Sequence, residues 1–215
     1  MNDSVAETGL KFFGTVSASI SHEIKNRMAV VNEQAGLLKD LVHLAGQGGE
    51  MNLDRLMRLA ESLKNQVDLT DGIIKNMNRF AHSVDSFQCQ SDLGEVLSLT
   101  ASLAKRTADN RGVRIELQVG EPAPRIFTAP FLLMNLIWLC LEAMMPLVDM
   151  ESPLMMGCEK TNDGAAVWFS ADQWPETGGP TLPEIADPLK AMLQVGIALY
   201  PDEKRLRIEL QKNDN

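Results

Sequence analysis

A histidine with an acidic neighbour and a following amide stands near the start of the chain, in the run Ser-His-Glu-Ile-Lys-Asn at residues 21–26. A neutral imidazole offers a nucleophilic ring nitrogen near physiological pH. The carboxylate of Glu23 can hold the proton of the other ring nitrogen and support positive charge as a phosphoramidate forms. Asn26 lies one helical turn beyond His22 and can hydrogen-bond a phosphoryl oxygen or position a water molecule. These three side chains are the candidate catalytic residues.

The apolar residues around His22 indicate which way its side chain points. Residues 10–45 contain no proline, and their apolar side chains recur at intervals of three or four, which predicts a helix. The series consists of Phe13, Val16, Ile20, Ile24, Met28, Val31, Ala35, Leu38 and Val42. His22 lies two positions from Ile20 and from Ile24, about 200° around a helix, so we expect it to face solvent. On spacing alone, an ordinary solvated histidine is the commoner explanation.

A second helical pattern follows the glycine-rich run at residues 46–49, which predicts a helix end because glycine is tolerated there and not in a helix interior. Asn52 is expected to cap this second helix, whose apolar residues alternate in steps of three and four. They are Leu53, Leu56, Ala60, Leu63, Val67, Thr70, Ile74, Met77, Ala81 and Val84. Two helices joined by a short turn predict an antiparallel hairpin. Because one hairpin covers only one side of each helix, we expect a homodimer with a four-helix bundle.

From residue 92 onward the pattern changes to mixed helices and strands. We expect helices over 93–110, 131–148 and 183–199, and strands over 113–119, 154–160, 165–171 and 205–210. This order predicts a helical layer on one face of a mixed sheet. The predicted fold class is therefore α+β, with the helical hairpin in residues 1–88 and a small α/β sandwich in residues 89–215.

Composition narrows the function classes. The formal net charge of −9 disfavours a nucleic-acid partner, because binding phosphates needs a basic surface. The first residues lack a basic segment followed by an apolar run, so no signal peptide is predicted. The apolar stretch 131–148 contains an amide, an acid and a proline, which favours a buried helix over a membrane span. Cys89, Cys140 and Cys158 lack metal-ligand spacing and are expected to be reduced thiols in a cytoplasmic protein.

The run at residues 21–26 and the amphipathic stretch after it resemble the H-box of sensor histidine kinases, whose usual form is SHELRNP. Asn-Arg-Phe-Ala at residues 78–81 also resembles the close of that family's second helix. The resemblance covers about residues 10–86. Arg27 stands where the family usually has proline, which removes a helix kink and leaves the phosphate acceptor intact.

The resemblance implies roles for the three candidate residues. His22 would be the phospho-acceptor, Glu23 the acid/base, and Asn26 a residue that tunes dephosphorylation. It also implies a histidine phosphotransferase of the two-component phosphorelay kind. Its partner would be the receiver domain of a response regulator or of a hybrid histidine kinase, whose aspartate exchanges phosphate with His22. The Mg²⁺ for this transfer is expected from the receiver, with no cofactor bound by this chain.

The second half resembles the Bergerat-type ATPase domain of the same kinases in the order of its elements. In that family a helix asparagine holds Mg²⁺ and phosphate, and Leu139 takes its place here without an oxygen to offer a hard cation. The family's adenine-reading motif is an aspartate followed by two alternating glycines. Asp172 matches the aspartate, but Trp174 replaces the first glycine. We therefore expect a degenerate domain without a nucleotide site, so that His22 must receive its phosphoryl group from another protein.

Two other functions stay open on the sequence. A non-catalytic adaptor or a phosphatase-type pseudokinase would dock a receiver or a kinase through the bundle, with His22 unused or with Asn26 assisting hydrolysis. An active autokinase with unusual nucleotide residues is the third possibility. Phosphate on His22 after incubation with a phosphorylated receiver would distinguish the phosphotransferase from the adaptor or pseudokinase. ATP binding would indicate the autokinase.

Overall fold

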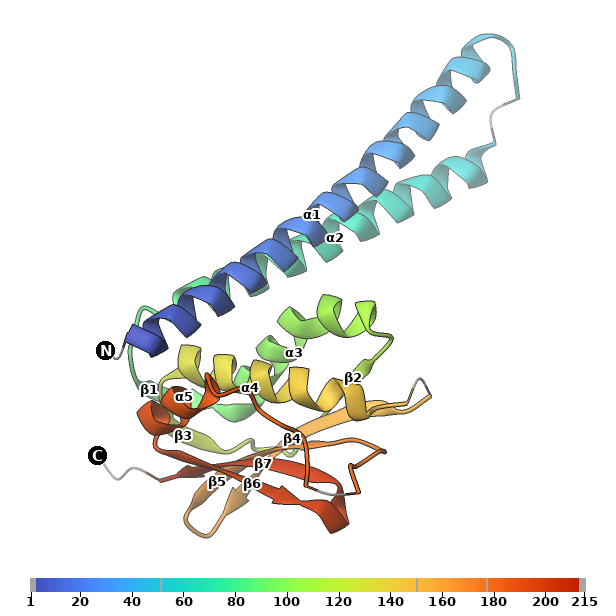
Figure 1. The fold of residues 1–215 in the computed structure, drawn as a ribbon. Coiled ribbons are helices and arrows are strands. Elements are labelled where there is room, and N and C mark those ends of the chain that lie inside the picture. Colours follow the sequence, from blue (N-terminus) through green and yellow to red (C-terminus); the bar gives the residue numbers. More distant parts are fainter. Residues whose placement is uncertain (1–2, 51, 150, 177, 213–215) are drawn as a thin grey trace. The chain divides into compact units, whose positions relative to one another are not determined.

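The computed structural model describes residues 3–50, 52–149, 151–176 and 178–212 (Figure 1). The chain divides into two compact units. Residues 17–78 form one, here called the hairpin unit, and residues 1–16 together with 79–215 form the other, here called the sheet unit. The sequence placed the division at residue 88, whereas the contacts group both open ends of the helical hairpin with the sheet.

Two long helices form the predicted hairpin, α1 (Asp3–Gly46) and α2 (Leu53–His82). Gly48, with φ of +91°, lies in the turn between them and adopts a backbone conformation that favours glycine. The side-chain oxygen of Asn52 accepts a hydrogen bond from the backbone N–H of Arg55 at 3.0 Å, so the predicted cap of α2 is present. The two helices are thus defined by local signals that the sequence carries.

Only part of each predicted apolar series lies against the other helix of the hairpin. Leu56, Leu63, Thr70 and Met77 of α2 are half-buried, as are Ile24, Val31 and Leu38 of α1. Within residues 17–78, the exposed remainder, here called the apolar stripe, consists of Met28, Ala35 and Val42 of α1 and Leu53, Ala60, Val67 and Ile74 of α2. On both helices the stripe lies about a quarter-turn from the inner face and in the same rotational sense. In an antiparallel pair this places both halves of the stripe on one side of the hairpin.

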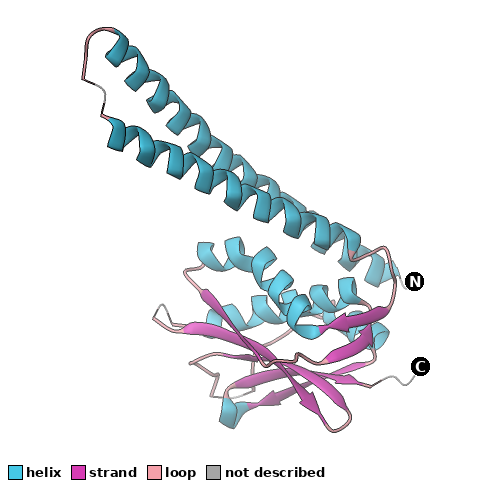
Figure 2. Cartoon of the chain, turned by 180° about the vertical axis from the view of Figure 1, so that it is seen from behind, coloured by secondary structure: helices cyan, strands magenta, loops and turns pink. Residues whose placement is uncertain are grey.

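The sheet unit has the mixed architecture that the sequence predicted. Its elements are β1 (Cys89–Asp92), α3 (Leu93–Asn110), β2 (Arg114–Val119), β3 (Arg125–Thr128), α4 (Pro130–Met144), the 3₁₀ turn η1 (Met145–Leu147), β4 (Pro153–Thr161), β5 (Gly164–Ser170), α5 (Ala186–Leu193), β6 (Val195–Tyr200), the 3₁₀ turn η2 (Pro201–Glu203) and β7 (Arg205–Gln211). Five strands follow the order β2-β4-β5-β7-β6, in which only β2 and β4 are parallel, and β1 pairs with β3 in a separate ribbon. Figure 2 shows α3, α4 and α5 on one face of the sheet. The α+β fold class is confirmed.

Three strands and the ends of two helices differ from the prediction, since the helix expected over 131–148 ends at Met144 and continues as the 3₁₀ turn η1. The helix expected over 183–199 ends at Leu193, because Gln194 has a left-handed backbone with φ of 55°. The residues after it pair with β7 as strand β6. Strands β1 and β3 have four residues each and pair with one another, although α3 and β2 lie between them in the sequence. A strand of four residues is too short to show an alternating pattern, so the sequence did not reveal this ribbon.

Helix α4 is the central core helix of the sheet unit. The segment 130–147 is long and apolar enough to cross a membrane, but 61 % of it is buried within the protein, as predicted for a core helix. The ring of Phe12 packs against Phe80, Phe131 and Trp138 with centroid separations of 5.4 to 5.6 Å. This cluster connects the first turns of α1 and the end of α2 with α4. It explains why residues 1–16 and 79–82 belong to the sheet unit.

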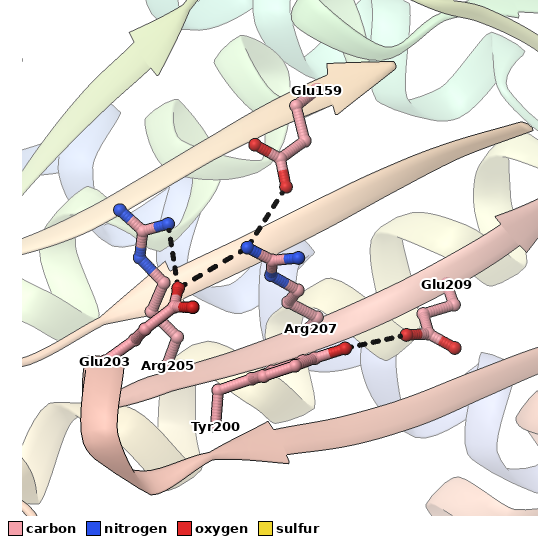
Figure 3. A network of polar contacts seen from close by, with 6 residues as sticks. All are labelled: Glu159, Tyr200, Glu203, Arg205, Arg207 and Glu209. Carbon is pink, nitrogen blue, oxygen red and sulfur yellow. Dashed lines mark hydrogen bonds and ion pairs between the residues drawn. The ribbon is translucent and has the colours of Figure 1, made fainter. Parts of the chain in front are cut away.

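The sheet face opposite the helices is covered by its own long side chains (Figure 3). Arg207 forms ion pairs with Glu159 at 3.3 Å and with Glu203 at 3.5 Å, and Arg205 pairs with Glu203 at 3.3 Å. The guanidinium of Arg205 also lies 4.6 Å from the ring centroid of Trp168, which is only 5 % exposed. A sheet face without a helical layer therefore still buries its aromatic residue.

Candidate functional site

His22 and Asn26 lie on the surface of α1, as the helical spacing predicted. Both side chains are exposed, and neither has a side-chain hydrogen bond to another described residue. Helical geometry places both on the flank of α1 away from the apolar stripe. An imidazole in this position is open to a second protein, while the opposite side of the hairpin carries the uncovered apolar residues.

Glu23 has a different environment from its two neighbours in the motif. Its side chain is 27 % exposed and points toward Arg27, with 3.9 Å between Glu23 Oε1 and Arg27 Nη2. Arg27 also reaches across to α2, where its Nη1 donates a hydrogen bond to Oε1 of Gln66 at 3.3 Å. Among the described residues, Glu23 has no hydrogen bond to His22. The structure therefore brings the candidate acid/base together with the guanidinium of Arg27, the residue that replaces the usual proline of the H-box.

A second polar contact crosses the inner face of the hairpin. Nε2 of Gln34 donates to Oγ of Ser62 at 2.6 Å, while the buried Oε1 of Gln34 has no partner within the described residues. Ser62 and Gln66 are four residues apart, so they lie on the same face of α2. Two polar residues at this spacing are a sequence signal for a polar stretch on the inner face of α2, but they do not identify Arg27 as the partner, because the partner depends on the register of the two helices. The heptad pattern did not predict this polar contact, because it rests on apolar positions.

Asp172, the residue matched to the adenine-reading aspartate, is used within the protein. Its Oδ1 accepts a hydrogen bond from the backbone N–H of Asp149 at 3.1 Å, and its carbonyl oxygen accepts one from Lys204 Nζ. Gln173 donates to Oδ1 of Asp149 at 2.5 Å and strengthens the same junction. The Asp149 backbone N–H is the main cause of a pKa of Asp172 below its ordinary value. The carboxylate thus holds the loop after η1 against the end of β5.

Trp174 fills the space next to this junction. Its Nε1 donates to the carbonyl of Gly178 at 3.2 Å, and its ring lies so close to Gly179 that a Cβ there would be 3.1 Å from Trp174 Cζ2. The same Cβ would lie 2.7 Å from Leu199 Cδ1 of β6. Glycine at 179 therefore serves the packing of the tryptophan and the leucine. Trp174 stands at the position matched to the first glycine of the family motif, and its ring is packed against Gly179.

Helix α4 offers no oxygen at the position matched to the metal-binding asparagine. Leu139 occupies that position and is half-buried. Asn135, one turn earlier, is 1 % exposed and lies inside the core. No group of three or more histidine, cysteine or acidic side chains comes together among the described residues. A leucine, a tryptophan and an aspartate that is already hydrogen-bonded do not fit a Mg²⁺-nucleotide held in the family's manner.

The remaining histidines and the cysteines lie elsewhere in the sequence than residues 21–26. His43 and His82 are exposed near helix ends, where His43 Nε2 is 3.0 Å from the Gln47 amide nitrogen and His82 Nδ1 is 2.7 Å from Asp85 Oδ2. The three cysteines are free. Burial raises the pKa of Cys158 to about 11, which keeps it a thiol near neutral pH.

No protein-family model matches the sequence, and no curated protein matches it either. Solved structures do match. The histidine kinase AdeS of Acinetobacter baumannii is similar with a TM-score of 0.50 and 11 % identity, over 84 % of this chain and 96 % of that structure. The chain has the histidine kinase fold.

Two further structures are similar over most of their length. The cytoplasmic segment of the histidine kinase QseC has 14 % identity and a TM-score of 0.45, covering 77 % of this chain and 98 % of that one. A bacterial phosphotransferase has 11 % identity and a TM-score of 0.46, covering 93 % of this chain and 95 % of that one. The similarity to AdeS confirms the predicted resemblance at the level of the fold. In this histidine kinase fold the hairpin matches the dimerisation and phosphotransfer helices, and the sheet unit matches the ATPase-like domain.

Proposed function

We propose that this chain is a histidine phosphotransferase of a two-component phosphorelay, in which His22 exchanges a phosphoryl group with the aspartate of a receiver domain. The observation that carries the proposal is the exposed His22 side chain in an H-box-like motif on the hairpin of a histidine kinase fold. Glu23 and Asn26 act with it as acid/base and as the residue that tunes phosphate loss. Transfer is proposed to run in both directions between His22 and the receiver aspartate.

The transfer requires little covalent chemistry from this chain. A ring nitrogen of neutral His22 attacks the phosphorus of the aspartyl phosphate, and the N–P bond forms as the P–O bond to the aspartate breaks. The receiver aspartate leaves as a carboxylate. The proton on the other ring nitrogen stays on the now cationic ring, and the Glu23 carboxylate accepts a hydrogen bond from it. The return transfer follows the same steps backwards.

A homodimer follows from the apolar stripe. Val67 is 57 % exposed and Leu53 is 66 % exposed, although both stand in a heptad pattern that is typical of buried positions. A second hairpin that packs on the stripe would complete a four-helix bundle. His22 and Asn26, on the other flank of α1, would remain open to a receiver in this dimer. We place the dimer in the cytoplasm, where receiver domains are found.

The proposed function does not include autophosphorylation from ATP. The residues at the family's metal and adenine positions are Leu139, Trp174 and a hydrogen-bonded Asp172, which argue against nucleotide binding. The phosphoryl group therefore comes from the receiver or from a kinase that carries one. The receiver's acidic pocket would hold the Mg²⁺ that neutralises the phosphoryl oxygens during transfer.

A transfer assay tests the proposal. The purified dimer is incubated with a receiver domain phosphorylated on its aspartate, and acid-labile phosphate on this chain is followed with time. We expect phosphate on the wild type, none on His22→Ala, and unchanged phosphate on His43→Ala, which removes another exposed histidine of the same helix. Stable receiver binding without phosphate on the wild type would instead support the adaptor. Phosphate on His22→Ala at the wild-type rate would show that another residue is the acceptor.

A further inference from the structure

We propose that Arg27 is a positioning residue for phosphotransfer, which holds the Glu23 carboxylate and ties it to helix α2 through Gln66. This inference rests on the proposed function of His22 and Glu23. It extends that function to a residue at which the chain departs from the histidine kinase H-box, where proline is usual.

The contacts around Arg27 connect three side chains from two helices. One terminal nitrogen of the guanidinium lies 3.9 Å from Glu23 Oε1, and the other donates to Gln66 Oε1 at 3.3 Å. The side chains of Arg27 and Glu23 are 34 % and 27 % exposed, so most of each is removed from water. A planar guanidinium can contact two acceptors at once through different nitrogens, which a lysine cannot do with the same geometry.

The need for such a contact follows from the flexibility of glutamate. A free glutamate on a helix surface samples several rotamers, and only some of them bring its carboxylate to the histidine of the same turn. Arg27 lies four residues after Glu23, on the same helix face, which is the spacing at which an ion pair restrains both side chains. Gln66 then restrains Arg27 from the neighbouring helix. The carboxylate is therefore confined to one region before a receiver binds.

A proline at residue 27 could not perform this role, since it has neither a charge nor a donor. The inner face of the hairpin would then have no link between the acid/base and α2. Replacing Arg27 by the proline that is usual in histidine kinases would therefore remove the contacts with Glu23 and Gln66.

The main experiment measures single-turnover transfer from a phosphorylated receiver over a range of receiver concentrations. We expect Arg27→Met to lower the maximal transfer rate at least about tenfold, and by no more than the roughly 10²–10⁴-fold that acid/base support contributes in full. The receiver concentration at half-maximal rate should stay the same. Lys25→Met is the control, since it removes an equal charge from the same turn on the outer side, and its maximal rate should equal that of the wild type. A higher half-maximal concentration with an unchanged maximal rate in Arg27→Met would mean that Arg27 contacts the receiver, and would overturn the proposal.

A double substitution tests whether Arg27 acts through Glu23. In a Glu23→Ala background, Arg27→Met should cause no further loss, because the group that it positions is already absent. An equal loss in both backgrounds would overturn the proposal. Gln66→Met should give a smaller loss than Arg27→Met, and Arg27→Lys should restore the rate only in part. If Arg27→Met does not fold by circular dichroism, Arg27→Lys and Gln66→Met provide the same test. Absence of transfer to the wild type would refute the proposed function itself, whereas normal transfer to Arg27→Met refutes only this inference.

Discussion

The hairpin unit and the sheet unit differ in how completely each buries its apolar residues. Leu136, Ile137, Leu154 and Phe169 of the sheet unit are fully buried by their own domain. In the hairpin unit, Met28 is 46 % exposed although it belongs to a regular apolar series. The sheet unit therefore buries its core residues within the chain, whereas the hairpin unit leaves part of its apolar series exposed. The homodimer proposed above would cover the apolar stripe of the hairpin unit.

The two units also differ in how they use polar residues at positions matched to the histidine kinases. On the hairpin, His22 and Asn26 are exposed and make no side-chain hydrogen bond within the described residues. In the sheet unit, Asp172 and Trp174 are both occupied by internal hydrogen bonds. Under the proposed function, chemistry belongs to the hairpin unit, whereas Asp172 and Trp174 stabilise the sheet unit. Substitutions of His22 and Asn26 should change chemistry, and substitutions in the matched positions of the sheet unit should change only structure.

The strongest test of this comparison introduces the same charge into each unit. Val167→Lys places an ammonium in β5 at a residue that is 0 % exposed, and we expect the sheet unit not to fold, since an unpaired buried charge costs several kcal/mol. Val67→Lys changes an exposed residue of the apolar stripe, so the helices should remain while the dimer dissociates. Circular dichroism and sedimentation measure the two outcomes. A Val67→Lys protein that stays dimeric at micromolar concentration would show that the stripe is not the dimer interface.

A large effect without structural loss is expected at Glu23. Glu23→Ala should slow phosphotransfer by about 10²–10⁴-fold, because acid/base support of this kind has that value. Asn26→Ala should instead change mainly the rate at which phosphohistidine loses its phosphate. Both rates can be followed with phosphorylated receiver and with isolated phosphoprotein, and the melting temperature of each variant should stay near that of the wild type. A lower melting temperature that accounts for the slower transfer would place Glu23 among structural residues.

The sequence predicted the long helices α1, α2 and α3 well, and it predicted α5 and the small strands poorly, for physical reasons. Helix α3 begins and ends where the pattern placed it, since Asp92 caps its first turn and Arg111 follows its last residue. The ribbon of β1 and β3 depends on pairing between distant segments, which a local pattern does not contain. At the candidate site, exposure of His22 followed from helical period alone. The contact between Arg27 and Gln66 did not, because it depends on the register of two helices.

A smaller effect is expected when the missing metal ligand is restored. Leu139→Asn returns the family's residue to α4, yet we expect no measurable ATP binding, because the ring of Trp174 and the hydrogen bonds of Asp172 remain in place. Isothermal calorimetry with Mg²⁺ and ATP checks this for the variant and the wild type. Micromolar, Mg²⁺-dependent affinity in the wild type would revive the autokinase function. Affinity in Leu139→Asn alone would mean that the tryptophan does not block the site.

The smallest expected effect concerns the pH dependence of the sheet unit. The pKa of Asp172 is lowered in the folded protein, chiefly by the backbone N–H of Asp149, so folding favours its charged form. The resulting stabilisation is present above the ordinary aspartate pKa of about 4 and is lost as the pH falls below it toward the folded pKa. Denaturant midpoints of the wild type and of Asp172→Asn are measured between pH 3 and 7. The two midpoints should differ at neutral pH and converge in acid. The difference should be small because solvent screens a partly exposed carboxylate. Asp202→Asn, an exposed acid of η2, serves as the control and should follow the wild type throughout. A constant difference between the wild type and Asp172→Asn at every pH would mean that the hydrogen-bond geometry, and not the charge, stabilises this loop.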